Sequence, residues 1–134
     1  MIVVDGLSND DSLELLNKLQ LEFLGKLRWI SQKDSGPAQA INKALLMFQG
    51  YINGSLNSGD IYTPDAISRA VAHFEKHPDR QLVYGFAQHI DAAGFPLGPY
   101  PTKPPSTHIN EFAKGSFICQ PTVFMRKEGL ALVD

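Results

Sequence analysis

The stretch Val3-Val4-Asp5-Gly6-Leu7-Ser8-Asn9-Asp10-Asp11-Ser12 combines the end of a strand, an acidic turn and the approach to a helix. Its two valines are β-branched and favour a strand, and the Asp-Gly pair that follows favours a turn. Ser8 with Asp11 three residues later matches the Ser-x-x-acid pattern of a helix cap, and leucines then recur at helical spacing over residues 13–19. The segment therefore predicts a strand, a polar turn and a helix in that order.

The same alternation recurs twice further along the chain. Strands are predicted over residues 27–31 and 51–56, and each runs into a polar turn that contains Asp and Gly. The helix after the first of these turns is expected to begin at Pro37 and to end at a Gly50 cap. The helix after the second is expected to begin at a Thr63-Pro64-Asp65 cap.

The remainder of the chain predicts a hairpin, a short helix and a last strand. The expected elements are a long strand over residues 82–90, a turn at 91–94, an antiparallel partner around 95–97, a helix over 107–114 capped by Ser106, and a strand over 122–125. Strands that alternate with helices predict an α/β fold. We expect a mixed, mostly parallel sheet flanked by helices, in one domain over residues 1–134.

Composition excludes several classes of protein. The 134 residues carry 12 Lys and Arg against 14 Asp and Glu, a formal net charge of -2, so we expect no nucleic acid partner. No apolar stretch reaches the roughly 18 residues that a membrane helix needs, so we expect no transmembrane segment and a cytoplasmic location. Cys119 is the one cysteine, which rules out an intramolecular disulfide.

Three carboxylates mark the expected ligand-binding edge. In open α/β sheets ligands bind beyond the carboxyl ends of the strands, and Asp5, Asp34 and Asp60 follow the first three predicted strands. Carboxylates accept hydrogen bonds from ribose and base, and they hold divalent ions against a diphosphate. Asp, Asn, Ser and Gly are equally favoured in caps and turns, so a purely structural role explains the same residues.

Other residues that could bind metal or react are weaker candidates. His73 and His77 lie four residues apart on a predicted helix, a spacing that zinc pairs use, but the sequence supplies no evident third ligand. Cys119 has no identifiable base partner, which favours a buried structural thiol over a nucleophile.

Several strings, in order, resemble family-2 glycosyltransferases of the GT-A fold. The first ten-residue stretch is similar to the family's Val-Val-Asp-Gly-Gly-Ser-Thr-Asp-Gly-Ser motif, and Leu56-Asn57-Ser58-Gly59-Asp60 is similar to its Leu-Asn-Ser-Asp-Asp form of the D-x-D metal turn. The other matching strings are Trp29 to Lys43, Val83-Tyr84-Gly85, His89-Ile90-Asp91 and Phe117-Ile118-Cys119-Gln120-Pro121. Each string alone is a weak signal, whereas their order over nearly the whole chain is a strong one.

The resemblance implies a partial GT-A fold and transfer of a sugar from a nucleotide-diphosphate sugar to an acceptor. By the same resemblance Asp5 would contact the base or ribose, and Asp34 with Gly36 would line the nucleotide pocket. Asp60 with Asn57 would hold Mg or Mn against the diphosphate. The metal would neutralise the charge that builds on the leaving nucleoside diphosphate.

Departures from the family pattern lead to further expectations. Gly59 stands where the family usually has a carboxylate, so metal affinity should be reduced. The family's first strand with its Pro-x-Tyr-Asn turn has no counterpart, and the general-base segment would follow residues 131–134. We therefore expect a domain that is truncated at both ends and is weakly active or inactive.

Two alternatives stay open. The chain could be a non-catalytic GT-A-like module that acts through self-association or partner binding, because loss of a central strand would expose strand edges and favour a homo-oligomer. An unrelated nucleotide-binding α/β protein would require the ordered strings to be accidental.

Overall fold

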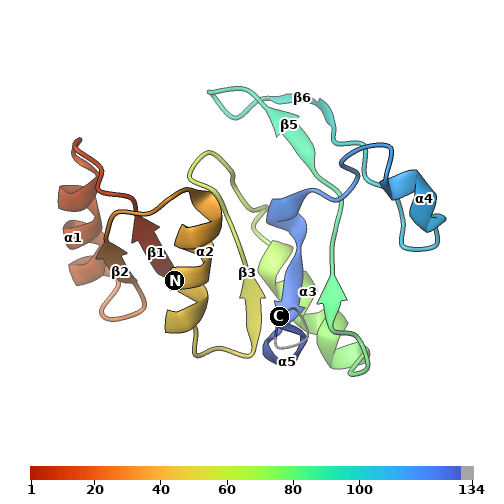
Figure 1. Ribbon diagram of the computed structural model, residues 1–134, viewed down its shortest axis with the longest axis horizontal. Helices are drawn as coiled ribbons and strands as arrows, with labels where there is room; N and C mark the ends of the chain where they lie inside the picture. The colour runs from red at the N-terminus through yellow and green to blue at the C-terminus, as the bar shows by residue number, and fades with distance from the viewer. Residues whose placement is uncertain (131–134) are drawn as a thin grey trace. The chain divides into compact units, whose positions relative to one another are not determined.

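The computed structural model describes residues 1–130 and divides the chain into two compact units, residues 1–49 and residues from 50 onward. The first unit holds β1 (Ile2–Asp5), α1 (Ser12–Glu22), β2 (Arg28–Ser31) and α2 (Pro37–Met47), as Figure 1 shows. The second holds β3 (Ile52–Gly54), α3 (Ala66–Lys76), β4 (Leu82–Val83), β5 (Gln88–Ile90), β6 (Pro96–Pro99), α4 (Ile109–Phe112), the 3-10 helix η1 (Gln120–Thr122), β7 (Phe124–Arg126) and α5 (Lys127–Leu130). The expected end of the domain, residues 131–134, lies outside the described residues.

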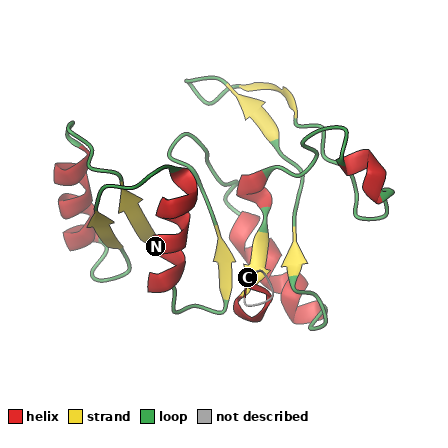
Figure 2. Cartoon of the chain, viewed as in Figure 1, coloured by secondary structure: helices red, strands yellow, loops and turns green. Residues whose placement is uncertain are grey.

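The first unit is built on a parallel pair of strands. β1 and β2 run side by side in a register that places Val4 opposite Ile30 and Asp5 opposite Ser31. Leu27, which precedes β2, is almost completely buried at 1% exposure. The predicted order of strand, turn and helix is confirmed here, and parallel pairing brings the carboxyl ends of both strands to one edge (Figure 2).

The predicted cap at Ser8 and Asp11 is wrong. Helix α1 begins at Ser12 with Asp11 as its N-cap residue, and the Asp11 side chain accepts no capping hydrogen bond. Asp10 takes that place, because its Oδ1 accepts from the Ser12 backbone N–H at 3.0 Å. The Ser8 hydroxyl donates to Asp5 instead and so belongs to the turn before the helix.

The predicted Gly50 cap is also wrong. Helix α2 ends at Met47, and Phe48 takes an extended backbone conformation as the C-cap residue. The Arg28 guanidinium donates from Nη2 to the Met47 carbonyl at 2.8 Å, which gives the last turn both a hydrogen-bond partner and a favourable positive charge. The Arg28 side chain of β2 therefore stabilises the end of α2, where the sequence had predicted a glycine cap.

The core of the second unit lies between α3 and a three-stranded antiparallel sheet. The strand order is β3-β7-β4, so the last strand in sequence occupies the middle. Ala70 and Phe74 of α3 are buried together with Phe124 of β7. Gly54 is required opposite Phe124, because a Cβ at this position would lie 2.7 Å from the Phe124 ring.

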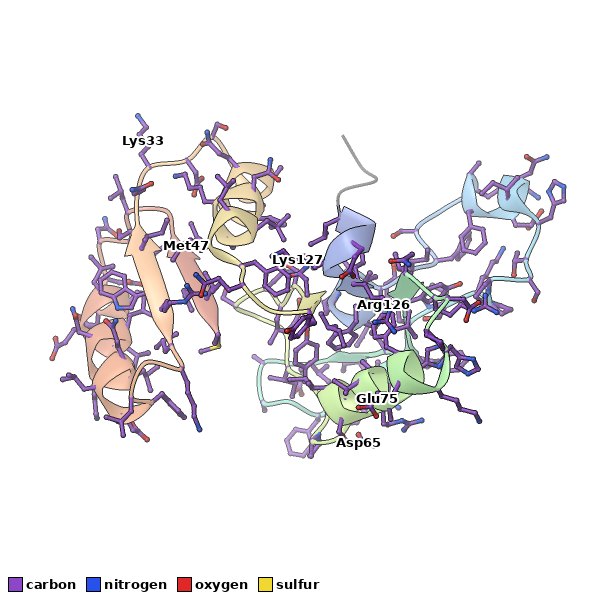
Figure 3. The ribbon with its side chains drawn as sticks, turned by 90° about the horizontal axis from the view of Figure 1, so that it is seen from below. Lys33, Met47, Asp65, Glu75, Arg126 and Lys127 are labelled. Atoms are coloured by element: carbon purple, nitrogen blue, oxygen red, sulfur yellow. The ribbon has the colours of Figure 1, made fainter. Side chains whose placement is uncertain are left out.

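Arg126 ties β7 to the helix. Figure 3 labels this side chain close to α3. Its Nη2 donates to the Phe74 carbonyl at 2.7 Å, its Nε donates to the Arg80 carbonyl at 3.0 Å, and its guanidinium lies 5.0 Å from the centre of the Phe74 ring. The side chain thus satisfies carbonyls near the end of α3 while it covers the most buried aromatic ring of the unit.

The long strand expected over residues 82–90 is divided in two. β4 pairs with β7, whereas β5 forms a separate antiparallel hairpin with β6, which confirms the predicted turn at residues 91–94. In the segment between the two strands, side-chain hydrogen bonds take the place of backbone pairing with a neighbouring strand. Tyr84 Oη donates to the Lys103 carbonyl at 2.8 Å, and Thr122 Oγ1 donates to the Gly85 carbonyl at 3.1 Å.

Two further helix starts differ from prediction. Helix α3 begins after Asp65, so Pro64 lies in the preceding turn. Helix α4 is capped by His108 and not by Ser106, because His108 Nδ1 accepts from the Asn110 N–H at 3.3 Å.

The α/β architecture is confirmed, and its sheets contain both parallel and antiparallel pairs. Only β1 with β2 is parallel among the pairs in the described residues, which differs from the mostly parallel expectation. The reason is β7, which returns between β3 and β4 and runs antiparallel to both. None of the helices over residues 1–130 is long and apolar enough to cross a membrane.

Candidate functional site

Asp5 is buried at the end of β1 and is surrounded by protein donors. Its Oδ2 accepts from the Leu7 N–H at 3.0 Å, the Ser8 N–H at 3.1 Å and Ser31 Oγ at 2.6 Å, while its Oδ1 accepts from the Ser8 hydroxyl. A carboxylate offers about four acceptor positions, so these donors occupy its capacity. The structural interpretation left open by the sequence accounts for every partner of Asp5, and a ligand hydroxyl would have to displace one of the two serines.

These hydrogen bonds hold Asp5 in its charged form. The Ser31 hydroxyl makes the largest contribution to lowering the pKa of the Asp5 carboxyl below its ordinary value, followed by the Ser8 hydroxyl. Donors that bind the charged form stabilise it relative to the neutral form. Asp5 is therefore a fixed negative charge at this edge of the first unit.

Asp34 lies against the turn that follows β1. Its Oδ2 is 3.2 Å from the position that a Cβ on Gly6 would take, so the absence of a side chain at Gly6 allows this approach. Its Oδ1 accepts from the Gly36 N–H at 3.0 Å. The structure thus brings the Asp34 carboxylate next to the Asp5–Gly6 turn within the first unit.

Gly36 has a conformational reason to be glycine. Its φ of 137° and ψ of 178° fall in a region that residues with side chains rarely adopt, and it is the N-cap residue before Pro37. Lys43 of the following helix holds the same loop, because its Nζ donates to the Lys33 carbonyl at 2.8 Å. The loop between β2 and α2 is therefore shaped by a glycine, a lysine and the Asp34 carboxylate.

The turn after β3 presents a carboxylate with few partners. Asn57 Nδ2 donates to Asp60 Oδ2 at 2.8 Å, and the Asp60 backbone N–H donates to the Asn57 carbonyl at 3.0 Å. No other side chain among the described residues donates to the Asp60 carboxylate. A Cβ on Gly59 would meet nothing within 4 Å, so the turn is open to solvent on that side.

Asp60 sets the local electrostatics of the second unit. Burial raises the pKa of the Tyr62 phenol and of the Cys119 thiol, and the negative charge of Asp60 raises both further. A thiol whose pKa is raised has less of the reactive thiolate at neutral pH. The environment of Cys119 thus agrees with the structural role expected from the sequence.

The second unit does not build a complete metal cage from its own side chains. The residues that the structure describes contain no group of three or more His, Cys, Asp or Glu arranged to hold a metal ion. A magnesium ion bound through phosphate needs only one or two protein carboxylates, since the phosphate oxygens supply other ligands. Asp60 fits that requirement, whereas Asn57 Nδ2 donates one N–H to Asp60 and one to Gln120.

His73 and His77 lie side by side with their rings tilted by 41°, and the described residues supply no third ligand. Their rings lie 4.6 Å apart between centres and border a cavity of about 310 Å³ that is also lined by Arg80 and Tyr84. No Cys, Asp or Glu in the described residues joins them. The geometry adds no evidence for a zinc site here.

Two partners of these carboxylates were missed by the sequence analysis. Ser31 lies opposite Asp5 in the β1–β2 register, so aligning the two predicted strands in parallel could have found it. Gln120 accepts from Asn57 Nδ2 at 3.0 Å across 63 residues of sequence, and no local pattern signals that contact.

Comparison with known proteins identifies the class. The family model described as glycosyl transferase family 2 matches residues 1–131. A chondroitin synthase of Escherichia coli is 33% identical over 92 residues, and a hyaluronan synthase of Pasteurella multocida is 33% identical over 90 residues. The alignments cover 69% and 67% of this chain. The chain therefore belongs to glycosyltransferase family 2.

The relatives are much longer than this chain. The matched segments span 13% of the Escherichia coli enzyme and 9% of the Pasteurella enzyme. An uncharacterized glycosyltransferase of Nostoc is 26% identical over 91 residues, which make up 27% of its length. The similarity therefore concerns one segment of each relative.

Proposed function

We propose that this chain binds a nucleoside diphosphate sugar and takes part in transfer of its sugar to an acceptor. Membership of glycosyltransferase family 2 supports the donor class, since the family implies use of a nucleotide sugar. Asp34 is proposed to contact the nucleoside, and Asp5, whose acceptors are occupied by protein donors, is proposed to hold the turn beside Asp34. Asp60 is proposed to bind the divalent cation that accompanies the diphosphate.

The open carboxylate of Asp60 is the observation that carries this proposal. One side-chain N–H group, that of Asn57, donates to it among the described residues, so most of its acceptor capacity is free for a cation. A bound Mg²⁺ or Mn²⁺ would neutralise negative charge on the diphosphate leaving group. Gly59 leaves this turn with one carboxylate, so the proposed affinity for the cation is modest.

Calorimetric titration of the chain with UDP and Mn²⁺ tests the proposal. We expect saturable binding that needs Mn²⁺, and Asp60→Ala should weaken it roughly a hundredfold, since loss of a charged ligand typically costs about 1.5 to 3 kcal/mol. Asp79→Ala is the matched control, because Asp79 is a largely exposed carboxylate of the same unit that pairs with the neighbouring Arg80. Absence of binding at millimolar UDP would contradict the proposal.

Self-association without catalysis is a second candidate function. Among the described residues β3 pairs on one side only, with β7, and its free edge lies next to the exposed ring of Tyr51. Unpaired strand edges recruit other chains. Light scattering is expected to show a homo-oligomer under this alternative, and a monomer at high concentration would exclude it.

A further inference from the structure

Gln120 connects two distant segments of the second unit. Its Oε1 accepts from Asn57 Nδ2 at 3.0 Å, and its Nε2 donates to the Ser55 carbonyl at 3.0 Å. The residue stands at the start of η1, 63 residues after Asn57. One glutamine side chain thus bridges both ends of the segment that leads from β3 into the Asn57–Asp60 turn.

The backbone around Gln120 is itself held in place. Thr122 Oγ1 lies 2.8 Å from the Cys119 carbonyl oxygen and 3.1 Å from the Gly85 carbonyl oxygen, and its one hydrogen is shared between these two acceptors. The Thr122 backbone N–H also donates to the Cys119 carbonyl at 3.0 Å. The η1 turn therefore offers Gln120 a fixed base from which to hold the Asn57 side chain.

Both N–H groups of the Asn57 amide are used in this arrangement. The amide has two N–H groups, and Nδ2 donates to two acceptors, Asp60 Oδ2 at 2.8 Å and Gln120 Oε1 at 3.0 Å. Removing the second acceptor would free the amide to rotate away from the carboxylate. Partners behind a metal-binding carboxylate orient it and affect metal affinity for this reason.

We propose that Gln120 is a positioning residue, which holds the Asn57 amide against Asp60 and so fixes the orientation of the carboxylate that binds the divalent cation. This inference rests on the proposed function of Asp60. Gln120 acts through Asn57 and is assigned no contact with the donor.

The first arm of the test needs no ligand. The side-chain amide resonances of Asn57 are recorded by NMR in the full chain, in Gln120→Ala and in Gln88→Ala. Gln88 is the matched control, because it is an exposed glutamine on β5 whose side chain has no hydrogen-bond partner among the described residues. We expect the Asn57 resonances to move in Gln120→Ala and to stay in place in Gln88→Ala.

The second arm measures Mn²⁺ binding in the presence of UDP. Gln120→Ala should weaken Mn²⁺ affinity about tenfold, at the lower end of what such partners contribute. Gln120→Glu keeps an acceptor for Asn57 Nδ2 but loses the donor to the Ser55 carbonyl, so it should recover only part of that loss. Gln88→Ala should bind as the unaltered chain does.

The outcomes separate the two proposals. Unchanged Asn57 resonances and unchanged Mn²⁺ affinity in Gln120→Ala would overturn the positioning role. Equal losses in Gln120→Ala and Gln120→Glu, accompanied by equal drops in thermal stability, would also overturn it, because they indicate a general structural role. If the unaltered chain binds no Mn²⁺ with UDP, the proposed function fails, and the NMR arm alone decides whether Gln120 holds Asn57.

Discussion

Asp5 and Asp60 are both aspartates at the carboxyl side of a strand, yet their surroundings differ. Asp5 is buried and accepts from two backbone N–H groups and two serine hydroxyls. Asp60 accepts from the Asn57 side chain in a turn that is open beside Gly59. A carboxylate whose acceptors are all used stabilises its own turn, whereas one with spare acceptors can bind a ligand. Position at a sheet edge alone therefore does not distinguish the two roles.

The largest expected effect is the difference in the free energy of unfolding between the Asp5→Ala and Asp60→Ala variants. Asp5→Ala removes the acceptor of the Leu7 and Ser8 N–H groups and of the Ser31 hydroxyl, and buried donors without partners are costly. It should lower the free energy of unfolding far more than Asp60→Ala does. Asp60→Ala removes one acceptor, that of Asn57 Nδ2, at a half-buried position, so it should change the free energy of unfolding by no more than about 1 kcal/mol. Urea denaturation measures both, and equal losses would remove the distinction.

Two glycines of the second unit provide the next comparison. Gly54→Ala places a Cβ 2.7 Å from the buried Phe124 ring and 3.1 Å from Tyr62 Oη, so it should cost roughly 2 kcal/mol of stability, as overpacking does. Gly59→Ala meets nothing within 4 Å and should stay within about 0.5 kcal/mol of the unaltered chain. Thermal or urea denaturation of both variants checks the expectation. A larger loss for Gly59→Ala would show that the turn is more confined than the structure indicates.

Gly59→Asp should increase the affinity of the Asn57–Asp60 turn for divalent cations. It adds a second carboxylate where there is open space, and hard divalent ions prefer carboxylate oxygens. We expect Mn²⁺ to bind about tenfold more tightly, which corresponds to about 1.4 kcal/mol. Electron paramagnetic resonance of free Mn²⁺ measures this, with Gly59→Ala as the control. Unchanged affinity would mean that a carboxylate at position 59 does not reach the cation, which would contradict a cation bound within this turn.

The smallest expected effect is on the pH dependence of stability. The pKa of Asp5 is lowered in the folded chain, mainly by Ser31, so its contribution is complete above the unfolded pKa near pH 4. That contribution is lost as the pH falls through the lower, folded pKa. Ser31→Ala removes the largest cause and should make stability decline less steeply below about pH 4. Urea denaturation between about pH 2 and 6 tests this, and an unchanged slope would contradict it.

The sequence was sufficient for features that rest on local patterns. The strand before Asp5, the helix that begins at Pro37 and the hairpin around residues 91–94 all follow from spacing and turn residues. The ordered strings also led to the correct family. These predictions succeeded because the residues that decide each element lie next to one another in the chain.

Features decided by distant side chains could not be predicted. The predicted Gly50 cap was wrong because Arg28 donates a hydrogen bond to the Met47 carbonyl at the end of α2. The predicted long strand over residues 82–90 was wrong because the Gly85 carbonyl accepts from Thr122 Oγ1 and not from a neighbouring strand. Gln120 reaches Asn57 across 63 residues. In each case the competing interaction comes from a segment that is brought near only by folding.

The strand order β3-β7-β4 has a consequence for synthesis of the chain. β3 and β4 do not pair with each other. Both pair with β7, whose residues 124–126 are synthesised after them. At translation rates of about 5 to 20 residues per second, residues 84–123 take roughly 2 to 8 s to emerge. During that interval the first unit can already pair β1 with β2, while the second holds two strands without a neighbour. A nascent chain would therefore be most exposed to pairing with foreign strands just before β7 leaves the ribosome.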